Sequence, residues 1–146
     1  MEKLVKNLNC LLADLNVFYR KLQNYHWNVK GKDFFTMHEK LEEYYDEINE
    51  QIDEVAEHIL MLNSEPLGTM KDYLDNTCIV EAKNEKIDGC KVIKNIITDY
   101  TTLLKKVTEI KEEADNQKDY GTSSLMDNYI SLYMKNLWML NQTISE

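Results

Sequence analysis

The stretch PLGTMKDYLDN, residues 66–76, contains the only proline of the chain and one of its four glycines. Proline cannot continue a helix, so the stretch separates the helical sequence before it from the helical sequence after it. Thr69 can accept a hydrogen bond from the first turn of a helix. The stretch therefore predicts a long connection with a short helix that begins after Thr69, and the length of this connection decides the fold.

Four amphipathic helices are predicted around this connection, because apolar residues recur with alternating gaps of three and four. With four glycines and one proline in 146 residues, the composition predicts an all-α protein. The apolar positions are Leu4, Leu8, Leu11, Leu15, Phe18, Leu22 and Tyr25; Leu41, Tyr45, Ile48, Ile52, Val55, Ile59 and Leu62; Ile93, Ile96, Tyr100, Leu103, Val107, Ile110 and Ala114; and Ile130, Tyr133, Leu137, Leu140 and Ile144.

The lengths of the connections predict how these helices are arranged in the bundle. Short turns near Gly31 and Gly121 predict two antiparallel hairpins. Roughly 18 residues are expected between the hairpins, and they reach about 60 Å when extended, whereas the second helix is about 42 Å long. One connection can therefore cross the whole bundle. This is a ferritin-like four-helix bundle with a short extra helix in its long crossover, and we expect a single domain over residues 1–146.

Charge and composition disfavour several other classes of protein. The net charge is −9, with acidic residues spread along the chain, and this field repels phosphate groups. Cys10, Cys78 and Cys90 are widely spaced, which favours reduced thiols over a disulfide framework or a structural zinc site. No signal-peptide pattern opens the chain, and no apolar run approaches the roughly 18 residues of a membrane span. We expect a cytoplasmic protein.

Four polar side chains share one face of the second predicted helix, within about 100° of one another, beside its apolar stripe. They are His38, Glu42, Asp53 and Glu57. Imidazole and carboxylate groups together are typical ligands of non-haem iron, with zinc as a competitor. Other carboxylates crowd the same helix, so a solvated acidic face is the alternative interpretation.

Distance along the helix restricts what this set can bind. His38 and Asp53 lie about 22 Å apart along the axis, whereas ligands of one ion lie about 2 Å from it. Two antiparallel copies of the helix, related by a twofold axis, would bring the His38 end of one against the Asp53 end of the other. The spacing predicts two identical sites between subunits. A di-iron site inside one bundle is disfavoured, because it uses two Glu-x-x-His motifs and the sequence contains none.

Several stretches resemble the Dps family, the mini-ferritins of bacteria. They are NYHWNVKGKDFFTMHEKLEEYYDE (24–47), IDEVAE (52–57), PLGTMKDYL (66–74) and NLWML (136–140), so the resemblance covers nearly the whole chain. It implies a hollow homo-dodecamer that stores ferric mineral. It also implies ferroxidase centres at the dimer interfaces that oxidise Fe(II), preferentially with hydrogen peroxide, and so protect against oxidative damage.

The resemblance assigns iron ligands residue by residue. His26, Asp53 and Glu57 are implied to come from one subunit, and His38 and Glu42 from its twofold partner. His26 and His38 are accordingly expected to serve different metal centres. Many relatives have aspartate where this chain has Glu42, which leaves occupancy of the second iron position open.

The resemblance and the helix geometry also predict roles for residues beside these ligands. Trp27 is implied to be an auxiliary electron donor that traps stray oxidising equivalents, with an aromatic anchor at the turn as the alternative. Tyr44 is expected to assist, while Tyr45 lies on the apolar stripe and is expected in the core. His58 follows Glu57 and points about 100° away from the site face, so we expect no ligand there.

In relatives, acidic residues of the turn between the third and fourth helices line pores for iron entry. The corresponding stretch here, EEADNQKDYGTSSLMD (112–127), offers Asp115, Asp119 and Asp127. A solvated acidic loop is the alternative interpretation of this stretch.

Binding of DNA in the nucleoid is the main alternative function. A third possibility is a purely structural helical shell that has no catalytic activity. DNA-binding members commonly carry a lysine-rich extension, but here the apolar stripes begin at Leu4 and end at Ile144, leaving Lys3 and Lys6 near the start. Twelve chains of −9 carry about −108, which opposes binding to DNA phosphates. We therefore expect iron detoxification without direct DNA binding.

Overall fold

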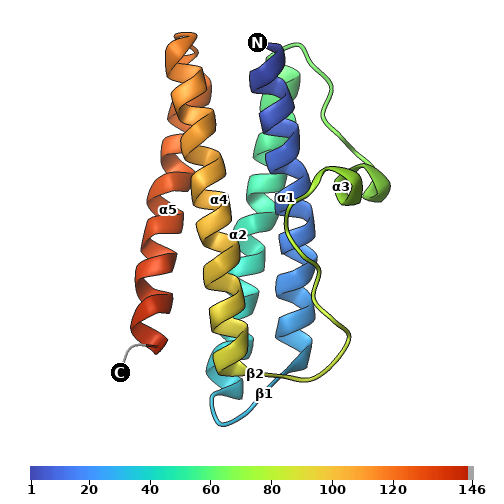
Figure 1. Ribbon diagram of the computed structural model, residues 1–146, viewed down its shortest axis with the longest axis vertical. Helices are drawn as coiled ribbons and strands as arrows, with labels where there is room; N and C mark the ends of the chain where they lie inside the picture. The colour runs from blue at the N-terminus through green and yellow to red at the C-terminus, as the bar shows by residue number, and fades with distance from the viewer. Residues whose placement is uncertain (145–146) are drawn as a thin grey trace.

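Four long helices stand side by side in the computed structural model, which describes residues 1–144 (Figure 1). In chain order the elements are α1 (Glu2–Asn28), β1 (Val29–Lys30), α2 (Phe34–Met61), α3 (Met70–Asn76), β2 (Ile87–Asp88), α4 (Gly89–Asn116) and α5 (Tyr120–Ile144). The predicted all-α, ferritin-like bundle with a short extra helix is confirmed. The single domain over residues 1–146 stays a prediction, and its last two residues lie outside the described part.

Two helical hairpins make up the bundle. The turn between α1 and α2 contains Gly31, whose φ of +121° is in a region that favours glycine. A second short turn joins α4 to α5, and α1 packs against α4 between the hairpins. Within residues 1–144, no helix is long and apolar enough to cross a membrane.

The crossover runs the length of the bundle along α1, from the end of α2 to the start of α4 (Figure 1). Its short helix α3 is capped by Thr69, whose Oγ1 accepts from the Asp72 backbone N–H at 3.1 Å, as predicted. The crossover spans residues 62–88, so the expectation of roughly 18 residues was wrong. The segment before α4 stays extended because Asp14 on α1 binds it and β2 pairs with β1 in parallel register.

The buried positions of α2 differ from the predicted stripe at two adjacent pairs, Tyr44 with Tyr45 and Gln51 with Ile52. Tyr44 is buried, whereas Tyr45 is half-buried, so placing Tyr45 in the core was wrong. The helix faces both α1 and the second hairpin, and this turns its buried face slightly from the predicted direction. Gln51 and His58 are also buried on this helix.

Polar side chains join α2 to α5 across the bundle. Tyr129 donates to Glu54 Oε1 at 2.9 Å, and Asn136 donates to Glu47 Oε1 at 3.4 Å. Between them, the hydroxyl of Tyr133 donates to the amide oxygen of Gln51. These contacts satisfy buried polar groups that a purely apolar interface could not hold.

Candidate functional site

Two histidine rings lie face to face where α1 ends and α2 begins. His26 is buried in the last turn of α1, and His38 is half-buried in the second turn of α2. Their ring centroids are 3.7 Å apart, and the ring planes differ by 11°. The antiparallel hairpin therefore brings together two side chains that are separated by twelve residues in the sequence.

The two histidines hold each other through reciprocal hydrogen bonds. His26 Nδ1 lies 2.6 Å from the backbone oxygen of His38, and His38 Nδ1 lies 2.7 Å from the backbone oxygen of His26. A carbonyl oxygen can only accept, so each Nδ1 carries the proton and donates it. In the neutral rings, each Nε2 then keeps its lone pair. This arrangement is typical of metal-binding histidines, whose second nitrogen is fixed by a hydrogen bond.

Glu42 extends the histidine pair with a carboxylate. Its Oε1 lies 3.8 Å from His26 Nε2 and 3.4 Å from the hydroxyl of Tyr45. The ring of Tyr45 stands edge-on to His26 at 5.4 Å. Desolvation, together with the charge of Glu42, raises the pKa of Tyr45, which keeps the phenol protonated as a donor to this carboxylate. We call His26, His38 and Glu42 the histidine half-site.

Asp53 and Glu57 lie farther along α2 and are both exposed. We call them the carboxylate half-site. The position of Asp53, 15 residues after His38, is about 22 Å away along the helix axis. Within the described residues, no three His, Cys, Asp or Glu side chains of one chain come together to hold a metal ion.

This placement corrects how the ligands were grouped. His26 belongs with His38 and Glu42, so grouping it with Asp53 and Glu57 was wrong. The expectation that His26 and His38 serve different centres fails for the same reason, because their rings are in contact. The short hairpin turn between α1 and α2, which helical spacing does not describe, fixes the neighbours of His26 in space.

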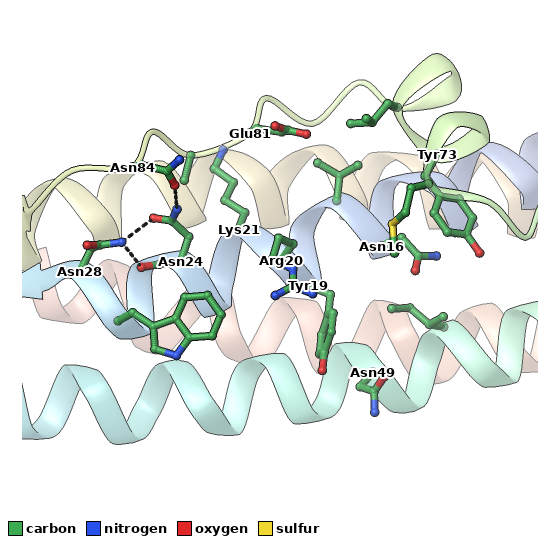
Figure 2. A pocket seen from close by; sticks show the side chains of 16 residues that line it. Asn16, Tyr19, Arg20, Lys21, Asn24, Asn28, Asn49, Tyr73, Glu81 and Asn84 are labelled. Atoms are coloured by element: carbon green, nitrogen blue, oxygen red, sulfur yellow. Dashed lines mark hydrogen bonds between the residues drawn. The ribbon is translucent and has the colours of Figure 1, made fainter.

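Trp27 points to a different surface from its neighbour His26. It is 55% exposed and lines a groove of about 450 Å³ between α1, α2 and the crossover. The guanidinium carbon of Arg20 lies 6.0 Å from its ring centroid, within range of a cation–π contact. Figure 2 shows Tyr19 of α1 pointing toward α2 in the same groove, where Asn49 lies on the opposite wall.

The remaining predicted residues have partners inside the chain. Asp119 accepts from the backbone N–H and the hydroxyl of Thr122, at 3.1 and 2.6 Å, and so caps the start of α5. Lys111 Nζ lies 2.9 Å from Asp127 and 3.6 Å from Asp115. A pore role for these carboxylates stays a prediction.

His58 faces the interior of the bundle. Its ring is buried, and Nε2 lies 2.7 Å from the hydroxyl oxygen of Thr122. Since that hydroxyl already donates to Asp119, Nε2 must be the donor. The expectation that His58 points away from the site face is confirmed.

Comparisons with known proteins agree with this architecture. A model of the ferritin-like domain matches residues 5–146. The DNA protection during starvation protein 2 of Bacillus anthracis is 38% identical and aligns over 99% of both proteins. The Dps protein of Vibrio cholerae O1, described as a member of a broad superfamily of ferritin-like diiron-carboxylate proteins, has a TM-score of 0.95 at 40% identity, covering 99% of this chain and 90% of that one. A zinc-soaked Dps of Listeria innocua has a TM-score of 0.93 at 30% identity, covering 97% and 95%. The chain belongs to the Dps family of the ferritin-like superfamily.

Proposed function

We propose that this protein is a ferroxidase that oxidises Fe(II) with hydrogen peroxide and stores the ferric product inside a homo-dodecamer. The observation that carries the proposal is the reciprocal bonding of His26 and His38, which leaves each neutral ring one unprotonated nitrogen beside the carboxylate of Glu42. Imidazole and carboxylate groups together are the usual ligands of non-haem iron.

Each centre would form where two chains meet. The histidine half-site of one chain would face the carboxylate half-site of its twofold partner, and the same contact would occur a second time across the axis. The supporting observation is the separation of about 22 Å between the half-sites along α2. Neither half-site alone offers enough ligands for a pair of iron ions.

The chemistry follows from having two ferrous ions in one centre. Two Fe(II) ions together give the two electrons that reduce hydrogen peroxide to water, so no hydroxyl radical is released. Zinc would compete for the same imidazole and carboxylate ligands. Trp27, which is exposed and next in sequence to His26, would serve as an auxiliary electron donor. We place this activity in the bacterial cytoplasm, because three widely spaced cysteines are typical of a reducing compartment.

DNA binding is the alternative function, since the Bacillus anthracis relative is named for DNA protection. We propose that this chain would protect DNA chemically, by removing iron and peroxide, because its charge of −9 opposes contact with phosphates. A gel-shift assay at low salt separates the two functions. A retarded DNA band that weakens as salt rises would support direct binding.

Anaerobic Fe(II) titration followed by addition of peroxide tests the ferroxidase function. We expect saturable Fe(II) binding and rapid oxidation in the unmodified protein, and at least a tenfold weaker response in His38→Ala, which lacks a ligand. His58→Ala is the matched control, because His58 is also buried and hydrogen-bonded but faces the bundle interior. Equal activity in His38→Ala and the unmodified protein would contradict the proposed site.

A further inference from the structure

Four buried tyrosines of α2, α4 and α5 form a continuous row inside the bundle. We call them the tyrosine chain: Tyr44, Tyr100, Tyr133 and Tyr129. Successive ring centroids along this row are 5.6, 5.6 and 6.2 Å apart. Rings this close exchange electrons readily, and phenol is, with indole, the protein side chain most easily oxidised by one electron at neutral pH. Of these residues, only Tyr44 was expected to assist the iron chemistry, and the other three have no role in it.

Two tyrosines of the row, Tyr133 and Tyr129, donate their phenolic protons to different acceptors. Burial raises the pKa of Tyr129 and of Tyr133, so both phenols keep their protons at rest. Tyr133 donates to the amide oxygen of Gln51, which is a very weak base. Tyr129 donates to the carboxylate of Glu54 at 2.9 Å. A phenol must lose its proton to remain oxidised, so Tyr129 is the best resting place for an oxidising equivalent.

Each end of the tyrosine chain is linked to a half-site through one neighbouring residue of α2. At one end, Tyr44 is next in sequence to Tyr45, which contacts both His26 and Glu42. At the other end, Tyr129 is bonded to Glu54, which is next in sequence to Asp53. The tyrosine chain therefore runs alongside α2, from the end that carries the histidine half-site toward the end that carries the carboxylate half-site.

We propose that the tyrosine chain is an electron relay that connects the two iron centres of a dimer through the interior of each subunit. This inference rests on the proposed ferroxidase function, because each subunit contributes one half-site to each centre. The relay would supply an electron when peroxide arrives at a centre that holds only one ferrous ion.

The redox step balances as follows. Reduction of one hydrogen peroxide breaks its O–O bond and takes up two electrons and two protons to give two waters. Fe(II) supplies one electron and becomes Fe(III). Tyr129 supplies the other through Tyr133, Tyr100 and Tyr44, and its phenolic proton moves to Glu54. The two protons taken up by peroxide come from solvent.

The relay also returns Tyr129 to its starting state. A ferrous ion bound near Asp53, in the other centre of the dimer, gives an electron to the tyrosyl radical, and the proton returns from Glu54. Two ferrous ions in different centres then share one peroxide. Centres that are half filled would in this way still reduce peroxide by two electrons.

Freeze-quench electron paramagnetic resonance tests the relay in the assembled protein. The protein is loaded anaerobically with one Fe(II) per chain, mixed with peroxide and frozen, and ring-deuterated tyrosine identifies a tyrosyl signal. We expect this signal in the unmodified protein and at least a fivefold smaller one in Tyr129→Phe and in Tyr133→Phe. The control is Tyr73→Phe, which also loses one hydroxyl hydrogen bond but lies outside the chain.

The rate of Fe(II) oxidation at full iron loading separates the relay from the ferroxidase function. We expect the four proteins to agree within twofold, which also shows that the variants assemble. Normal oxidation with undiminished tyrosyl signal in Tyr129→Phe and Tyr133→Phe would overturn the relay alone and leave the tyrosines a packing role. No peroxide-driven oxidation in the unmodified protein would overturn both proposals.

Discussion

A buried ion pair joins α1 to α4. Lys21 Nζ lies 2.9 Å from Asp99 Oδ2, and both side chains are less than a tenth exposed. Burial raises the pKa of Asp99, while the hydrogen bond from Lys21 acts in the opposite direction. Each charge is therefore tolerated in the interior only because the other is present.

Asp99→Asn should lower the free energy of unfolding by about 3–5 kcal/mol, because it leaves the Lys21 ammonium buried without a counter-charge. The measurement is urea unfolding at fixed protein concentration. Asp75→Asn is the matched control, since it breaks the exposed pair with Lys71 and should cost at most about 1 kcal/mol. Similar small losses in both variants would contradict this reading of the buried pair.

Single residues show where sequence reasoning succeeded and where it stopped. His26 and His38 were selected from residue type and family pattern, but their contact depends on the turn between two helices, which no helical spacing describes. Tyr44 and Tyr45 are adjacent aromatic residues, so periodicity alone could not decide which one enters the core. Which side chains meet and which are buried depends on their hydrogen-bond partners, and these partners come together only once the helices are packed.

At the scale of elements, the crossover is a strap bound to α1 at several heights. Near its start, Asn9 Oδ1 accepts from the Leu67 backbone N–H at 2.9 Å. At mid-height, Asp14 accepts from the Cys78 backbone N–H at 2.9 Å and from the hydroxyl of Thr77 at 2.8 Å. Pairing of β2 with β1 fixes its end. The strap thus determines where α4 begins.

Asp14→Ala should loosen the middle of the strap while the helices remain. The bond from an N–H to a carboxylate contributes about 1.5–3 kcal/mol, so exchange of the Cys78 amide hydrogen should become about ten to a hundred times faster. Hydrogen exchange read by mass spectrometry measures this change over residues 77–80. In Asp75→Ala, which removes an exposed carboxylate from the same strap, exchange should stay as in the unmodified protein. Unchanged exchange in Asp14→Ala would show that Asp14 does not hold the strap.

The helices themselves were predictable because their apolar stripes and stop signals are local. The existence of α3 and its cap at Thr69 were predictable for the same reason. The full length of the crossover was not, because residues 77–86 contain Ile79, Val80 and Ala82, which a helix could also accept. They stay extended through contacts with Asp14 and β1, which are distant in sequence.

At the scale of the whole molecule, one chain holds two half-sites and completes neither. The histidine half-site and the carboxylate half-site lie at different heights on α2, about 22 Å apart. A twofold dimer is the smallest assembly that joins one to the other. We therefore propose that every iron centre takes ligands from two chains.

Co-assembly of two inactive variants shows whether a centre is shared between chains. One variant carries His26→Ala and His38→Ala, and the other carries Asp53→Ala and Glu57→Ala. Each alone should lack peroxide-driven Fe(II) oxidation. In a mixed dimer, one centre has both halves altered and the other has both halves intact, so random assembly of equal amounts should restore about a quarter of the unmodified activity. Activity in the mixture at that level, after the two variants are unfolded and refolded together, is the result we predict. A mixture as inactive as its components, although size and helix content show mixed assemblies, would contradict a centre shared between chains.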